Sequence, residues 1–142
     1  MSVQDIVAEV ARKNGVDEVM VISTSKLEVK EWVGERCRWL KAEPLSTAQA
    51  RIVLREYGEC ALVVGKDALK FREQLQAIEH DLRKKGHYKA WAIINEPLGQ
   101  HSLMPCHEFF CIDIIATLRR YKKNLQLPEP GDYAPWGIIL IE

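Results

Sequence analysis

The residues best suited to chemistry gather in one short stretch, residues 104–113. It reads Met-Pro-Cys-His-Glu-Phe-Phe-Cys-Ile-Asp and contains Cys106, His107 and Cys111. In a helix, His107 and Cys111 would lie four residues apart on one face. Two ligands at that spacing can hold one metal ion. The stretch is therefore a candidate metal site, with Cys106 as a third ligand in an irregular first turn and Cys37 as a fourth from elsewhere.

The same residues also have purely structural interpretations. Strong zinc sites show two close pairs of cysteines, and this chain has none. Cys106 and Cys111 are five residues apart, which places them about 140° apart around a helix. On this interpretation Cys111 is a small core residue and His107 an exposed turn residue. Cys37, between two arginines, is either a thiol with a lowered pKa or a buried cysteine.

Two other residues have simpler interpretations. Cys60 lies in an apolar run and is expected in the core. Asp113 is an acidic residue in an apolar segment, and a buried carboxylate is costly unless it is paired or hydrogen-bonded. It is expected either to anchor the structure, with Thr117 or an arginine as partner, or to line a pocket. No nucleophile elbow, phosphate-binding loop, dinucleotide fingerprint or zinc-protease motif occurs, so we expect a binding protein rather than an enzyme.

The composition of the chain limits which binding partners and which cellular compartment are expected. The chain has 142 residues, 47% apolar and 28% charged, as in ordinary globular proteins. Twenty basic residues balance 20 acidic ones, so no broad attraction to nucleic acid or membrane is expected. No apolar segment approaches the ~20 residues that span a bilayer, and the first residues do not resemble a signal peptide. We expect a cytoplasmic protein whose four cysteines are thiols or ligands.

Helices and strands alternate along the chain. Capping boxes at Ser2 with Asp5 and at Ser46 with Gln49 predict two helix starts. The pattern predicts helices over about 3–14, 47–57, 68–85 and 105–123, and strands over about 19–22, 60–64, 88–94 and 138–141. This order predicts one α/β domain over residues 1–142, a layered sandwich with one sheet of about four strands alternating with helices. Strand order and direction stay open.

Three stretches are similar to segments of one known family. Residues 15–37 resemble its opening strand and first cysteine, and residues 86–93, Gly-His-Tyr-Lys-Ala-Trp-Ala-Ile, resemble a Gly-Tyr-Tyr-Lys-Ala segment. Residues 111–117, Cys-Ile-Asp-Ile-Ile-Ala-Thr, resemble a Gly-Ile-Asp-Val run, and a closing strand ending in Glu142 also fits. The chain thus resembles the cysteine-rich family of predicted metal-binding proteins, a domain of unknown function found mainly in anaerobes and archaea.

The resemblance implies a metal or iron–sulfur centre held by many cysteines. Cys37 matches, but the cysteine-rich stretch after it is shortened to residues 38–44, and a second cluster is reduced to residues 96–104 without cysteine. Phe110 stands at a cysteine position of the family, and Cys111 at a glycine position. Because a full iron–sulfur centre needs about four thiolates, the resemblance implies either a smaller metal site or the loss of the metal.

Our leading expectation is a non-catalytic metal-binding or metal-centre accessory protein with a reduced ligand set. The expected ligands are Cys37, Cys106, His107 and Cys111. The metal is not identified by the sequence: zinc and iron both suit these ligands, and a chain without metal is also compatible with it.

Two alternatives come from other classes of protein. One is a metal-free interaction or assembly subunit that docks a protein partner or a second copy of the chain. A contiguous exposed patch of Trp32, Trp39 or Trp136 would favour it. The other is a small-molecule or cofactor binder, which a deep pocket near Asp113 and His107 would favour.

Overall fold

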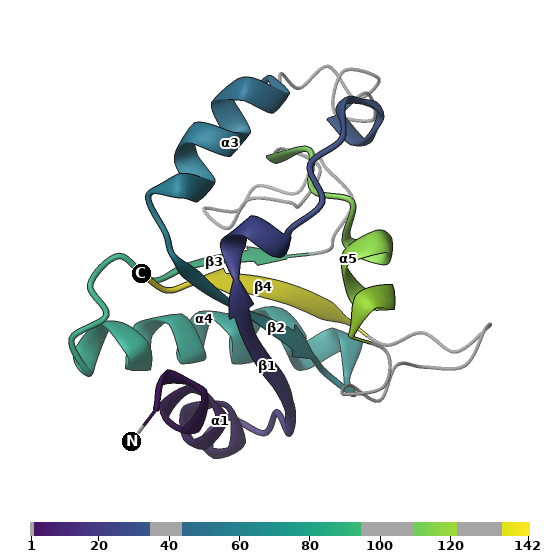
Figure 1. Ribbon diagram of the computed structural model, residues 1–142. Helices are drawn as coiled ribbons and strands as arrows, with labels where there is room; N and C mark the ends of the chain where they lie inside the picture. The colour runs from purple at the N-terminus through teal and green to yellow at the C-terminus, as the bar shows by residue number, and fades with distance from the viewer. Residues whose placement is uncertain (1, 35–43, 95–109, 122–134) are drawn as a thin grey trace.

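The chain forms a four-stranded antiparallel sheet with helices on both faces (Figure 1). The computed structural model describes residues 2–34, 44–94, 110–121 and 135–142. In chain order the elements are α1 (Val3–Lys13), β1 (Glu18–Ser23), the 3-10 helix η1 (Thr24–Lys26), α3 (Thr47–Arg55), β2 (Glu59–Val64), α4 (Ala68–Lys84), β3 (Trp91–Ile94), α5 (Ile114–Arg120) and β4 (Trp136–Leu140). The predicted layered α/β architecture with about four strands is confirmed.

The last strand in the sequence lies inside the sheet. The strand order is β1-β2-β4-β3, and each neighbouring pair is antiparallel. Leu140 of β4 is paired with Cys60 of β2 on one side and with Trp91 of β3 on the other. β2 and β3 therefore run in the same direction, with α4 as the connection between them and β4 inserted in the gap.

Short-range capping chemistry sets the helix starts. The Ser2 side chain accepts a hydrogen bond from Asp5 N at 3.1 Å, and the Ser46 side chain accepts one from Gln49 N at 3.1 Å. The reciprocal bonds to the backbone of each serine are also present, so both predicted capping boxes are confirmed. Asp67 caps α4, accepting from the Leu69 amide at 3.0 Å.

Alternate strand residues bury opposite faces of the sheet. On the face covered by α1 and α4, the core includes Val7, Val10, Ala61, Val63, Phe71, Leu75, Ile78, Leu82 and Ile139. On the face covered by α3 and α5, it includes Leu54, Cys60, Leu62, Phe110, Ile112, Ile138 and Leu140. Burying one large apolar side chain stabilises a fold by about 1.5–3 kcal/mol. The apolar stripe of α4, formed by Phe71, Leu75, Ile78 and Leu82, is thus part of the first core layer.

Helix side chains cover parts of both outer strands. Gln4 of α1 spans two residues of β1: its Nε2 donates to Val19 O at 3.3 Å, and its Oε1 accepts from Val21 N at 2.7 Å. At the other edge, Glu79 of α4 accepts from Ala92 N at 2.6 Å. These bonds replace those that a further strand would make, so the two edges are partly closed to strand addition.

The third strand is shorter than the predicted span of 88–94. It begins at Trp91, because Gly86 ends α4 with φ +104° and a turn follows, in which Ala90 N donates to His87 O at 3.1 Å. Tyr88 is 82% exposed and belongs to this turn. The His87 side chain is 12% exposed, and its Nδ1 lies against the Glu142 carboxylate.

Candidate functional site

The described part of the candidate metal segment, residues 110–113, precedes α5 rather than forming part of it. Cys111 has φ +57°, and Ile112 forms an isolated antiparallel bridge with Val29. The predicted helix over 105–123 is therefore wrong at residues 110–113, and Cys111 is not part of an α-helix. The cause is Asp113, whose carboxylate accepts from Ala116 N at 3.1 Å and so begins the helix after itself.

Backbone hydrogen bonds hold this segment against residues 28–30. Lys30 N donates to Cys111 O at 2.8 Å, and Asp113 N donates to Glu28 O at 2.7 Å. Thr117 of α5 adds two bonds: its Oγ1 donates to Asp113 O at 2.9 Å and accepts from Glu28 N at 3.2 Å. Five residues are thus tied into one small ladder, which fixes the position of Cys111.

Asp113 is a structural anchor. It is 8% exposed, and its carboxylate lies 3.3 Å from the Lys30 Nζ while it caps α5. A buried carboxylate with a cation and a backbone amide has the partners that its desolvation requires. The expected local partner Thr117 does contact Asp113, but through the main-chain carbonyl.

The Cys111 thiol packs where two segments of the chain approach one another. It is 3% exposed, and its Sγ donates to Leu45 O at 3.2 Å. A Cβ atom built on Gly34 would lie 2.8 Å from this sulfur. Residues 34 and 45 stand on either side of the segment that carries Cys37. Cys111 therefore contacts both ends of the chain portion from which a second ligand was predicted.

The remaining predicted ligands, Cys37, Cys106 and His107, lie outside the described residues. Within the described ranges, no group of three or more histidine, cysteine, aspartate or glutamate side chains is arranged to hold a metal ion. Cys60 belongs to the core, and burial raises the pKa of its thiol to about 12. Neither Cys60 nor Cys111 is in a disulfide.

The described residues do not show the contiguous tryptophan patch that would favour an interaction subunit. Trp32 is 59% exposed, whereas Trp136 is half-buried against the core on the α3 side of the sheet. Trp39 lies outside the described ranges. Exposure of Trp32 alone gives no extended apolar surface.

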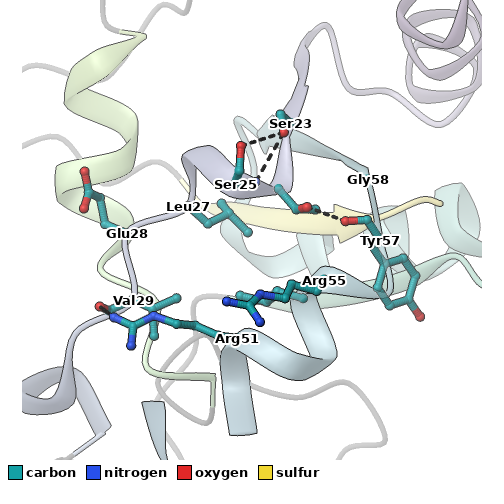
Figure 2. A pocket seen from close by; sticks show the side chains of 11 residues that line it. Ser23, Ser25, Leu27, Glu28, Val29, Arg51, Arg55, Tyr57 and Gly58 are labelled. Carbon is teal, nitrogen blue, oxygen red and sulfur yellow. Dashed lines mark hydrogen bonds between the residues drawn. The ribbon is translucent and has the colours of Figure 1, made fainter. Parts of the chain in front are cut away.

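A groove of about 540 Å³ opens between η1 and α3 (Figure 2). It is lined by Ser23, Thr24, Ser25, Leu27, Glu28, Val29, Arg51, Leu54, Arg55, Tyr57 and Gly58. Asp113 is not among these residues, so the groove is not the pocket expected near that side chain. The groove was not predicted from the sequence. The available signal is the spacing of Arg51 and Arg55, four residues apart on one face of the predicted helix over 47–57.

No protein-family model, no curated protein and no solved structure matches this chain. Among the helices that the structure describes, none combines the length and the apolar character needed to cross a membrane. The class that the fold defines is thus a layered α/β protein built on an antiparallel sheet. Its function has to be argued from the residues themselves.

Proposed function

We propose that this chain is a non-catalytic metal-binding or metal-centre accessory protein, with Cys111 as one of its ligands. The observation that carries the proposal is the backbone of Cys111. Of the non-glycine residues that the structure describes, it alone has a positive φ, +57°. Left-handed backbone costs an ordinary residue roughly 1–2 kcal/mol relative to the right-handed form. Such strain is concentrated at functional sites, and here it supports a requirement for the sulfur.

The surroundings of Cys111 support a shared site. Cys37 follows Gly34 by three residues, and Cys106 precedes Cys111 by five. Since a residue spans at most about 3.6 Å, three residues reach no further than about 11 Å. The contact between Gly34 and the Cys111 sulfur thus limits how far apart the predicted ligands can lie. Thiolate and imidazole ligands suit zinc or iron, and a reducing cytoplasm would keep the thiols available.

The backbone conformation of Cys111 also supports the proposed relationship to the cysteine-rich family. The resemblance assigns Cys111 to a glycine position, and φ +57° is a conformation that glycine adopts at little cost. A cysteine at this position is compatible with a site in which the ligand has moved by one residue from the position that Phe110 holds.

The test is the metal content of protein purified without oxygen, with iron, zinc and acid-labile sulfide measured together. Cys111→Gly is the key variant, because glycine relieves the left-handed backbone and the variant is expected to fold. Cys60→Ala is the matched control, since it removes a thiol that lies in the core.

Near-stoichiometric metal in the wild type and in Cys60→Ala, lost in Cys111→Gly, would support the proposal. Replacing Cys37, Cys106 and His107 singly by alanine would then define the rest of the ligand set. Wild-type protein that carries no metal and binds neither zinc nor ferrous iron would overturn it.

A further inference from the structure

Apolar side chains form the floor of the groove between η1 and α3. Leu27, Leu54 and Tyr57 are each less than a tenth exposed and belong to one core cluster. The rim is tied to the turn after α3: Thr24 Oγ1 donates to Tyr57 O, and Thr24 N donates to Gly58 O at 3.1 Å. The groove is therefore held open by packed core residues and hydrogen bonds, as preformed ligand sites are.

Two guanidinium groups form one wall. Arg51 and Arg55 lie four residues apart and leave α3 on the same face. Figure 2 shows both side chains extending in the same direction, toward Val29. Arg51 Nη2 donates to Val29 O at 3.4 Å, which uses one of its five N–H donors. No hydrogen bond or ion pair joins Arg55 to any other residue within the described ranges.

The positive charge of this wall is not neutralised from within the groove. Glu28 is the acidic residue among those that line it, and its carboxylate is paired with Arg120 of α5. In Figure 2 the Glu28 carboxylate points away from Arg51 and Arg55. The two arginines therefore face the groove with a net positive charge and unused donors, an arrangement that attracts an anion.

We propose that this groove binds a small organic anion, with its carboxylate or phosphate head held by Arg51 and Arg55 and its apolar body over the floor. Guanidinium groups present paired N–H donors that match either oxyanion. The hydroxyls of Ser23 and Ser25, 2.8 Å apart, supply further polar contacts on the opposite rim. The volume of about 540 Å³ falls within the roughly 300–1,000 Å³ of small-molecule sites. The site needs no metal and is independent of the function proposed for Cys111.

The test is a titration of ¹⁵N-labelled full-length protein, followed by amide chemical shifts, with benzoate, phenyl phosphate and inorganic phosphate as probes. Shifts are expected in residues 23–29 and 51–58. The two phenyl compounds are expected to bind more tightly than inorganic phosphate, because only they cover the apolar floor. Their relative affinity identifies the preferred head group. No saturable shift in these segments with either phenyl compound, or equal affinity for inorganic phosphate, would overturn the proposal.

Arginine variants test the wall directly. Arg51→Gln and Arg55→Gln should each weaken phenyl-ligand binding about tenfold, as loss of a charged hydrogen bond does. Both side chains are exposed and glutamine is a good helix former, so the fold should persist. Arg12→Gln in α1, on the other face of the sheet, is the matched control and should bind as the wild type does. Equal weakening by all three variants, or by none, would contradict a site built by Arg51 and Arg55.

Discussion

The sulfur of Cys111 occupies the space that a side chain at Gly34 would need, since a Cβ atom there would lie 2.8 Å from it. The two residues are far apart in the sequence, and each adjoins a stretch that carries predicted ligands. Their contact therefore brings the described Cys111 next to the chain segment that leads to Cys37, as the proposed metal site requires. It also defines a substitution whose closest clash is with this sulfur, the Pro44 side chain being the next neighbour at 3.3 Å.

Gly34→Ala should lower the free energy of unfolding by about 1–3 kcal/mol, the usual cost of forcing an extra methyl group into a packed site. Urea unfolding at equilibrium measures it. Gly58→Ala is the control, because the nearest atom to a Cβ there is 3.4 Å away. Combining Gly34→Ala with Cys111→Gly should recover most of the loss. Strictly additive effects would mean that the sulfur is not the cause.

Cys111→Gly should be more stable than Cys111→Ala by about 1 kcal/mol, because glycine adopts left-handed backbone without the Cβ penalty. Both variants lack the thiol, so the difference between their unfolding free energies measures the cost of the backbone conformation at φ +57°. The same pair made at Cys60, inside β2, should show the opposite order, since glycine weakens a strand. Thermal or urea unfolding of the four variants settles the comparison, and alanine equal to glycine at position 111 would contradict it.

Asp113→Ala should destabilise the protein by about 0.5–2 kcal/mol through loss of the α5 cap. Asp113→Asn keeps a capping oxygen and removes the charge that faces Lys30, so a smaller loss is expected. Asp67→Ala removes the cap of α4. Asp67 makes no ion pair within the described ranges, so this variant measures the stability lost with a cap alone. If asparagine cost as much as alanine, the ion pair rather than the cap would hold this segment.

Alkaline pH should destabilise the fold through Cys60. Burial raises the pKa of its thiol from 9.0 to about 12. Between pH 9 and 12 the unfolded chain releases the thiol proton while the folded chain retains it. The free energy of unfolding therefore keeps its full value, as far as this thiol is concerned, below pH 9 and falls as the pH rises from 9 toward 12. Burial also raises the pKa of Tyr57. Comparing the pH dependence of unfolding free energy in the wild type and in Cys60→Ala therefore isolates the contribution of the thiol. Equal pH slopes of unfolding free energy in both proteins would contradict this assignment.

Local chemistry explains what the sequence predicted well. The capping boxes of Ser2 and Ser46 depend on residues three positions away, and both helices begin where those pairs place them. Asp113 shows the limit of the same reasoning. Its capping role was hidden by the apolar residues around it, which extended the predicted helix backward through Cys111. Asp before an apolar run is itself a helix-start signal, and it was available in the sequence.

Long-range pairing explains what the sequence did not show. Cys60 pairs with Leu140, a partner that no spacing within either strand specifies. The groove has the same origin, since Arg51 and Val29 meet across it from segments 22 residues apart. Arginines on the outer face of a predicted helix look like ordinary solvated charges until the opposite wall is known. The candidate ligands were chosen for their chemistry, and of the four only Cys111 lies in the described ranges.

The position of β4 between β2 and β3 has a consequence for biosynthesis. A ribosome delivers β1, β2 and β3 well before residues 136–140, yet β3 has β4 as its sheet neighbour. Until that strand emerges, β2 presents one unpaired edge and β3 has no strand to join. Nascent chains with exposed apolar strand edges aggregate readily and are the substrates on which chaperones act. Completion of this sheet is therefore a late event in synthesis, and a stall before residue 136 should leave a chain that depends on chaperones.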